Sequence, residues 1–233
     1  MSDEVLTDEF FEEARERLKT RLKPKRYEHS LSVAHMAVVL ARAYGVDERR
    51  ARIAGLLHDW DKNYKDFEIR ARARELGVNV SDEIIEDMPQ LLHGPTAARA
   101  LAREYPALDA DILQAIDRHT SAAVGMSDLD MVIFTADAIE PLRPFTDMAG
   151  IRAAIGKVSL ERLFFETLRH VMLFLTSRGK TMHPDTLSVW NHYARRLDQA
   201  GEDLTVILAN DLVPARGKEA GTKPAKEKRK ERK

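Results

Sequence analysis

The stretch GLLHDWDK, residues 55–62, decides how the rest of the chain can be interpreted. It continues an apolar run that starts at Ile53, and it closes with four ionisable side chains within five positions: His58, Asp59, Asp61 and Lys62. Ionisable groups at the end of a buried segment lose hydration, and that loss is tolerated when the groups are paired or coordinate a metal ion. The stretch therefore predicts a buried helix that ends in a site for a metal ion or a phosphate.

Composition sets the class of protein. The 233 residues are 44% hydrophobic, which is enough for one sizeable domain or two small ones. The absence of cysteine excludes disulfides, zinc–thiolate sites and thiol nucleophiles. The N-terminal stretch MSDEVLTDEFFEE is acidic and lacks the apolar region of a secretory signal. No apolar run reaches the roughly 18 residues of a membrane span. We therefore expect a soluble, cytoplasmic protein.

Hydrophobic periodicity predicts an all-α fold, because apolar residues recur at helical spacing and strand-like alternation of β-branched residues is absent. Capping residues and the Gly and Pro positions set the expected ends. A short helix is expected to open at Ser81. The longer helices are expected over residues 8–22, 26–44, 47–57, 66–77, 95–105, 109–119, 127–139, 159–178 and 184–199.

Three regions are expected along the chain: an N-terminal helix over residues 1–23, one domain over residues 24–200, and a polar, basic tail over residues 201–233. Residues 216–233 carry 9 Lys or Arg and 3 Glu, which gives them a charge of +6 and leaves −7 on the preceding chain. We expect the tail to be disordered, with at most weak electrostatic contact to nucleic acid. The acidic body argues against a broad nucleic-acid surface.

Five positions place an ionisable side chain in an unusual context. His29 lies one helical turn after Arg26, His58 precedes Asp59, and His119 ends an apolar helix. His93 precedes an expected helix N-terminus, where amide groups favour anions, and Asp137 lies within the apolar segment VIFTADAIEP. One such residue alone is more often a hydrogen-bonded core residue than a ligand. Five in one domain predict a site for a divalent ion such as Fe, Mn, Co or Zn, which imidazole and carboxylate suit.

The other four histidines lack polar neighbours of this kind, and we expect them to be structural or on the surface: His35, His170, His183 and His192.

The order H…HD…D resembles the HD-domain metal-dependent phosphohydrolases. The matching residues are His29, His58, Asp59 and Asp137. Further segments narrow the resemblance: RYEHSLSV, GLLHDWDK, LLHGPTAA, AIDRHT followed by GMSDLD, and VIFTADAIEPLRPF. Taken in this order over about residues 25–195, they look like the YqeK-type symmetrical diadenosine tetraphosphate hydrolases.

This resemblance implies an HD-domain helical bundle and a metal site. The implied metal ligands are His29, His58, Asp59 and Asp137. Iron is the expected ion, with Mn, Co or Mg as alternatives. A second ion near His93 and His119 is left open.

The resemblance also implies a substrate side. Arg26, Lys62, His93 and His119 would face the nucleotide phosphates, and Gly125 and Met126 would lie near the nucleotide. Asp59, Lys62 and His119 form the expected catalytic set. His119 is preferred as proton donor because histidine titrates near neutral pH, although sequence does not separate it from His93. Glu140 and Arg143 are expected to support the ligands, with surface ion pairing as the alternative.

Two features depart from the family pattern. Members usually carry a glycine near position 122, where this chain has Ala122 followed by Ala123, so the loop on the nucleotide side is expected to differ. Trp60 and Asp61 stand where many members have small or apolar residues. Asp61 is expected either to help position Lys62 or to be a surface variation.

The resulting hypothesis is symmetrical hydrolysis of diadenosine tetraphosphate to two ADP, with a small dinucleoside polyphosphate as the partner, no membrane, and a homodimer left open. Two alternatives remain at this point. One is another HD-type phosphohydrolase, such as a nucleotidase or a guanosine alarmone hydrolase. The other is a nucleotide-binding regulatory module without catalysis.

Overall fold

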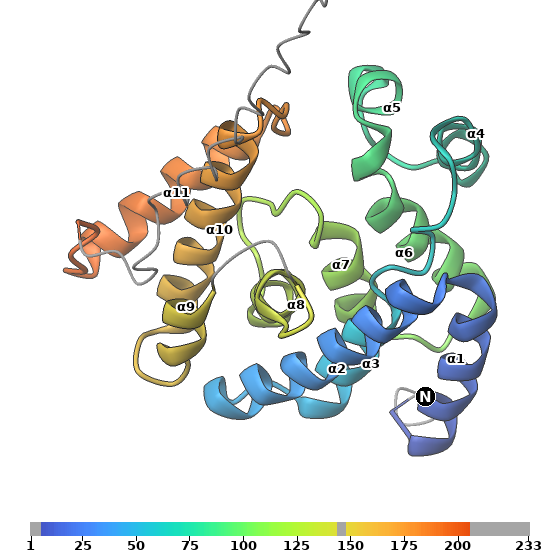
Figure 1. Ribbon diagram of the computed structural model, residues 1–233, viewed down its shortest axis with the longest axis horizontal. Helices are drawn as coiled ribbons and strands as arrows, with labels where there is room; N and C mark the ends of the chain where they lie inside the picture. Colours follow the sequence, from blue (N-terminus) through green and yellow to red (C-terminus); the bar gives the residue numbers. More distant parts are fainter. Residues whose placement is uncertain (1–5, 144–147, 206–233) are drawn as a thin grey trace, which may run out of the picture.

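The computed structural model describes residues 6–143 and 148–205, and every regular element within these ranges is helical (Figure 1). The all-α prediction is therefore confirmed. The α-helices are α1 (Asp8–Arg21), α2 (Pro24–Tyr44), α3 (Glu48–Leu57), α4 (Asp66–Leu76), α5 (Asp82–Asp87), α6 (His93–Glu104), α7 (Ala110–Arg118), α8 (Asp128–Ile139), α9 (Ala149–Ala153), α10 (Leu160–Ser177) and α11 (Thr186–Gln199). A 3₁₀ turn, η2 (Pro89–Leu91), precedes α6.

Side-chain caps fix four of the predicted helix starts. The carboxylate of Asp47 accepts from the backbone N–H groups of Arg49 and Arg50 at the start of α3. Ser81 and Ser159 cap α5 and α10 in the same way, and Ser127 forms a capping box at the start of α8. These side chains satisfy amides that have no partner within the helix. The four starts were expected from sequence, because small polar residues precede apolar periodic segments there.

Three helix starts differ from expectation, and at a fourth, Asp109 before α7, the start is as expected but the side-chain cap is missing. Pro24 occupies the first turn of α2, so that helix begins two residues early. Asp66 is the first residue of α4, and the carboxylate of Glu68 accepts from the Lys65 amide instead. Asp109 makes no capping bond and pairs with Arg50 at 3.0 Å. The last long helix, α11, begins at Thr186 rather than at residue 184.

The start of α6 is the difference that matters for the site. Sequence placed Pro95 at the first position, with His93 ahead of the helix, whereas α6 begins at His93 itself. The 3₁₀ turn η2 supplies the first turn of backbone, so the helix is already wound when it reaches the imidazole. The expectation that His93 precedes a helix N-terminus was wrong. The short helix α9 was not predicted either.

Most helices share one core. In Figure 1, α2 lies along α3, α8 lies between these helices and α10, and α11 packs on the outer side of α10. Helix α1 buries Phe10, Phe11, Ala14 and Leu18 in this same core. A smaller apolar cluster joins α4, α5 and the η2–α6 junction, through Ile69, Ile84 and Leu92 among others. None of the described helices combines the length and apolarity needed to cross a bilayer.

Two glycines let helices approach closely next to the candidate ligands. A Cβ on Gly55 of α3 would lie 2.9 Å from the Cα of Ala34 in α2. A Cβ on Gly94 of α6 would lie 2.9 Å from the carbonyl oxygen of Ile116 in α7. The facing atoms are backbone, so they cannot move aside alone. Glycine at these positions therefore sets the helix spacing from which His58 and His119 project.

Replacing Gly55 with alanine should separate α3 from α2 and displace His58, three residues later. We expect the free energy of unfolding to fall by about 2 kcal/mol, the usual cost of overpacking, together with weaker metal binding. Gly45→Ala is the control: nothing lies within 4 Å of its Cβ, and only its φ of 72° opposes a side chain. It should cost about 1 kcal/mol and leave metal affinity unchanged. Thermal unfolding and metal titration measure both, and unaltered metal affinity in Gly55→Ala would contradict this role.

Candidate metal centre

Four histidines and two aspartates from five parts of the fold converge on one buried point. His29 comes from α2, His58 and Asp59 from the end of α3 and the turn that follows. His93 opens α6, His119 follows the last residue of α7, and Asp137 lies in the last turn of α8. All are buried except Asp137, whose side chain is 18% exposed. The structure thus brings together residues 108 positions apart in sequence.

The carboxylate of Asp59 lies between two pairs of histidines. Its Oδ2 is 3.7 Å from His29 Nε2 and 3.5 Å from His58 Nε2. Its Oδ1 is 3.2 Å from His93 Nε2 and 3.9 Å from His119 Nε2. Each carboxylate oxygen therefore faces one histidine pair. This arrangement divides the centre into two donor sets that share Asp59.

Asp137 completes the first donor set. Its Oδ1 lies 2.9 Å from His29 Nε2 and 3.6 Å from His58 Nε2. In the second set, the Nε2 atoms of His93 and His119 are 3.1 Å apart. Donor atoms of three overlapping groups lie within 4.8 Å of one another: His29–His58–Asp59, His58–His119–Asp137 and Asp59–His93–His119.

The four imidazoles are oriented through their other nitrogen. In three of them Nδ1 lies at hydrogen-bond distance from the carbonyl oxygen three residues earlier: His58 to Gly55 at 2.7 Å, His93 to Gln90 at 2.8 Å, and His119 to Ile116 at 2.7 Å. In the fourth, His29 Nδ1 lies 2.9 Å from a carboxylate oxygen of Glu140. Because these acceptors take a proton from Nδ1, the lone pair of a neutral ring resides on Nε2. All four Nε2 atoms face the centre.

The donor set fits a divalent cation. The Nε2 atoms of His29 and His58 are buried, and in rings protonated on Nδ1 they share no hydrogen with the carboxylate oxygens that face them. A nitrogen lone pair that faces carboxylate oxygens without a shared hydrogen is stabilised by a cation between them. The absence of thiolate and the presence of imidazole and carboxylate suit a borderline first-row ion.

The pKa shifts of the histidines and aspartates in the cluster also support a cation site. Burial acts to lower the pKa of His58, but Asp59 and Asp137 outweigh burial and raise that pKa to about 10. Burial acts to raise the pKa of Asp59, yet His58 and other neighbours hold it well below its usual range. Burial, with the neighbouring imidazoles of His58 and His93, holds the pKa of His119 well below its usual range. The carboxylates are thus ionised, and their charge attracts a cation, be it a proton on His58 or a metal ion.

Charged residues outside the centre support the ligands. Glu140 is 1% exposed, and its carboxylate lies at hydrogen-bond distance from His29. Arg143 pairs with Asp137. Burial acts to raise the pKa of Asp137, but the positive charge of Arg143 is the main cause that holds this pKa well below its usual range. The prediction that Glu140 and Arg143 are partners of the ligands is confirmed. Arg26 Nη1 lies 3.0 Å from Asp59 Oδ2, so the residue expected to face the phosphates contacts a candidate ligand.

Lys62 lies beside the second histidine pair. Its Nζ is 3.1 Å from His93 Nε2, and burial lowers the pKa of its ammonium group. The side chain comes from the same turn as His58 and Asp59, as the sequence suggested. It places a cation next to the donor set rather than on the outer surface.

Asp61 holds this turn from the opposite side. It is 1% exposed, and its carboxylate binds Arg21 of α1 at 3.0 Å and Arg72 of α4 at 2.6 Å. Neighbouring Trp60 is 1% exposed, with the guanidinium of Arg21 4.4 Å from the centre of its ring. The alternative that Asp61 is a surface variation was wrong. The ion pairs that connect Asp61 to Arg21 of α1 and Arg72 of α4 could not be predicted from the sequence. Both arginines lie in amphipathic helices that contain many other charged residues.

The loop between α7 and α8 contains Gly125 and Met126. Tyr193 of α11 accepts a hydrogen bond from the Met126 amide at 2.8 Å, and Arg118 donates to the Gly125 carbonyl at 3.2 Å. Neither residue has a described contact with the histidine cluster, so their nucleotide role stays a prediction. Ala122 has a φ of 58°, a left-handed conformation that costs a side chain about 1 kcal/mol or more. A glycine, which the family resemblance leads us to expect near this position, would adopt this conformation without that cost.

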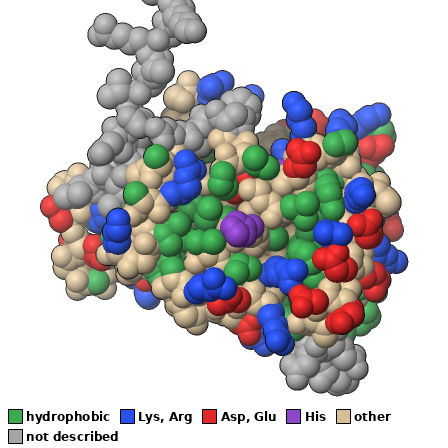
Figure 2. Space-filling view, turned by 60° about the horizontal axis from the view of Figure 1, so that its bottom comes forward, with side chains coloured by type: hydrophobic (Ala, Val, Ile, Leu, Met, Phe, Trp, Pro, Cys, Tyr) green, Lys and Arg blue, Asp and Glu red, His purple; other side chains and the backbone are tan. Residues whose placement is uncertain are grey.

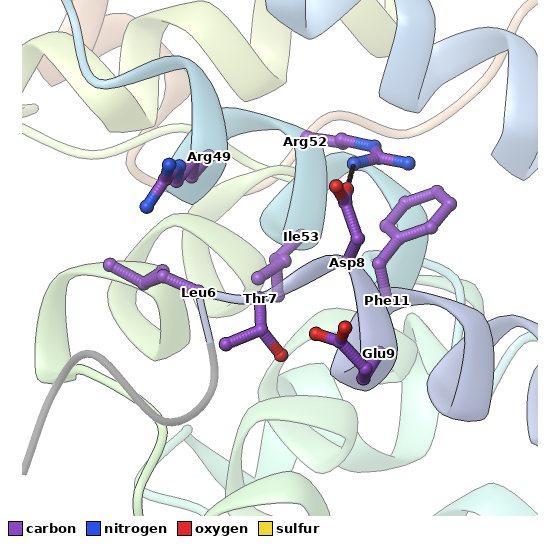
Figure 3. Close-up of a pocket in the computed structure, with 8 residues that line it drawn as sticks. All are labelled: Leu6, Thr7, Asp8, Glu9, Phe11, Arg49, Arg52 and Ile53. Atoms are coloured by element: carbon purple, nitrogen blue, oxygen red, sulfur yellow. Dashed lines mark hydrogen bonds and ion pairs between the residues drawn. The ribbon is translucent and has the colours of Figure 1, made fainter.

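Two surface pockets lie away from the cluster. One pocket, of about 260 Å³, lies between the start of α1 and α3. Figure 3 shows the guanidinium of Arg52 in contact with Asp8 and beside the ring of Phe11. The other, of about 340 Å³, is lined by Arg21, Trp60 and Tyr64 among others. The cluster itself is buried, and the face in Figure 2 shows one histidine among mixed apolar and charged side chains. Of the histidines assigned to the structure or surface, none belongs to a candidate metal group within the described residues.

Comparison with known proteins matches the part of the chain that contains these candidate ligands. Residues 26–142 match the HD domain family model, a span from the helix that carries His29 to just beyond Asp137. The chain belongs to the HD-domain family. It is 34% identical to the symmetrical bis(5'-nucleosyl)-tetraphosphatase of Bacillus subtilis (strain 168), over 77% of this chain and 95% of the relative. The protein of the same name from Staphylococcus aureus (strain NCTC 8325 / PS 47) is also 34% identical, over 78% of this chain and 93% of the relative.

A solved HD-domain structure has the same architecture. It is described as a predicted HD superfamily hydrolase involved in NAD metabolism from Clostridium acetobutylicum. The two chains are 33% identical and superpose with a TM-score of 0.73, over 80% of this chain and 97% of the other. The HD-domain fold expected from the motifs is therefore confirmed.

Substitutions at Asp59 and Asp61 test which of these neighbouring aspartates binds the metal and which only stabilises the fold. Asp59→Asn should abolish stable metal binding, because it removes the charge shared by both donor sets, while circular dichroism still reports a helical fold. Asp61→Asn should retain metal at saturating concentration but lower the free energy of unfolding by about 3 kcal/mol, because it unbalances a buried ion pair. Metal analysis after dialysis and thermal unfolding separate these effects. Full metal content in Asp59→Asn would contradict the assignment.

Proposed function

We propose that the protein is a metal-dependent hydrolase that cleaves diadenosine tetraphosphate symmetrically to two ADP. The main support is the shared Asp59 centre inside an HD domain whose relatives, matched over nearly their whole length, are named for this activity. A nucleotide-binding module without catalysis would not require a buried donor set with its supporting residues in place. That alternative is disfavoured.

The proposed ligands are those carried over from the family motif: His29, His58, Asp59 and Asp137. The His93–His119 pair is proposed to hold a second ion together with the other oxygen of Asp59. This proposal rests on the direction of the Nε2 atoms, and it makes His119 a ligand in preference to a proton donor. Iron is the proposed metal, because imidazole and carboxylate donors suit it, with Mn, Co or Mg as alternatives.

A bound divalent ion would supply an activated water and neutralise phosphate charge. The chain's own contribution is orientation and fixed charge. Glu140 and Arg143 hold His29 and Asp137, so the first donor set keeps its shape while substrate binds. Lys62 presents a half-buried ammonium group beside His93, and Arg26, whose side chain is 35% exposed, can face both Asp59 and solvent. We assign both cations to the polyphosphate, whose charge increases on the leaving ADP as the bridge breaks.

Symmetrical cleavage requires that the site binds the two phosphates of one ADP half of the substrate. Arg26 and Lys62 supply donors for two adjacent phosphates, which would place an inner phosphorus against the centre. We assign Gly125 and Met126 to the nucleoside end of that half. A nucleotidase that removes one phosphate needs fewer such donors. The cytoplasm is the proposed location, and a homodimer stays a prediction.

Product analysis tests the function. Purified, metal-loaded protein should convert diadenosine tetraphosphate to ADP alone, and reaction in ¹⁸O-labelled water should place one label in one of each two ADP molecules. Lys62→Ala should reduce turnover at least tenfold with metal content retained, because it removes charge stabilisation and no ligand. Lys65→Ala is the matched control, an exposed lysine three residues later.

Different products would identify a different enzyme. Equal ATP and AMP as first products would reject symmetrical cleavage. Rapid hydrolysis of a mononucleotide or a guanosine alarmone, without action on dinucleoside tetraphosphates, would favour another HD-type phosphohydrolase. Full activity after complete chelation would reject the metal-dependent mechanism.

A further inference from the structure

The long helix α10 is buried in its first half and partly exposed in its second. Its buried residues end at Leu168. The apolar residues that follow are only partly covered by the described residues, and Leu173 is 42% exposed. The run from Val171 to Leu175 reads VMLFL, with no polar side chain to favour solvent. Val171 and Met172 pack against the core, and Leu173 is the exposed large apolar side chain of this run. An apolar side chain left exposed beside partly buried ones is consistent with a contact site.

One face of α10 already holds the chain that follows α11. Arg162 donates from Nη1 to the Asp203 carbonyl at 3.0 Å, and Arg169 donates from Nη2 to the Leu204 carbonyl at 2.8 Å. Positions 162, 166, 169 and 173 recur at spacings of four and three, so they line one face of the helix. The chain therefore advances along this face from Arg162 to Arg169, and Leu173 is the next residue on it.

The direction of this segment agrees with the packing of the two last helices. Arg196, near the end of α11, pairs with Glu161 at the start of α10, so the helices run antiparallel and lie side by side (Figure 1). Gly201, with a φ of 80°, then reverses the chain. Leu204 packs against the main core after this reversal. The segment thus leaves the described structure while it heads along α10.

The sequence beyond this point suits an apolar surface. Residues 206–213 read VILANDLV, in which six of eight residues are aliphatic, and the basic run begins only at Arg216. The predicted polar tail was drawn from residue 201, but residues 201–205 are described, and residues 206–233 lie outside the described residues. Leu173 lies about 6 Å beyond Arg169 along the helix axis, a distance that two or three extended residues span.

We propose that residues 206–213 dock along the Arg162–Leu173 face of α10 and cover its apolar second half. The separate basic tail then begins only after Pro214. The chain's own segment is favoured over a second copy because Arg162 and Arg169 already direct it onto this face. The proposal does not depend on the catalytic function.

Cysteine pairs test this placement directly, because the natural chain contains no cysteine to interfere. Leu173→Cys is combined in turn with Val206→Cys, Ile207→Cys and Leu208→Cys in the full chain. Mild oxidation should produce an intramolecular disulfide in at least one pair, seen by mass spectrometry and as a faster-moving monomer on a non-reducing gel. The matched control replaces Leu187 of α11, which is 63% exposed, in place of Leu173.

Each other outcome overturns the proposal. Equal cross-linking to positions 173 and 187, or no intramolecular cross-link to position 173, would show that the segment does not occupy this face. Disulfide-linked dimers through position 173 would assign the face to a second copy.

Two truncations provide a second measurement. A chain cut after Pro214 should unfold at the same temperature as the full chain. A chain cut after Thr205 should unfold about 5 °C lower, because it loses the apolar segment as well. Equal unfolding temperatures for the two truncations would count against docking.

Discussion

The centre depends on one buried carboxylate. Asp59 has an oxygen facing each of two histidine pairs, at distances from 3.2 to 3.9 Å. Its negative charge in a dehydrated site is stable only when cations lie on both sides. Arg26 and Lys62 supply part of that positive charge, and the unshared electron pairs of the imidazole Nε2 atoms mark where a further cation would bind. The rest of the fold can be understood as support for this group.

That support is mostly backbone. Three of the four histidines are oriented by the carbonyl oxygen three residues earlier, so the position of each ring follows from the position of its helix. Helix positions are in turn set by close packing, which Gly55 and Gly94 permit. The clamp of Asp61 by Arg21 and Arg72 connects the same turn to α1 and α4. A displacement of any of these helices would therefore move a donor atom of the centre.

Much of this could be predicted from sequence. Local signals were sufficient for helices that start at Asp47, Ser81, Ser127 and Ser159, because a cap and its helix are neighbours in the chain. The family motif pointed to the residues that the structure brings together. What sequence could not provide was long-range: the pairing of Asp61 with two distant arginines, and the division of the donors into two sets around Asp59. The start of α6 was misplaced because a proline suggested a first turn that η2 had already formed.

The most direct test of the shared centre is a crystal structure of metal-loaded protein with anomalous diffraction measured at the absorption edge of the bound metal. The account predicts two anomalous peaks, one beside His29, His58 and Asp137 and one beside His93 and His119, about 3.5–4 Å apart with the Asp59 carboxylate between them. A single peak that leaves one histidine pair without metal at saturating concentration, or peaks that do not contact Asp59, would contradict it.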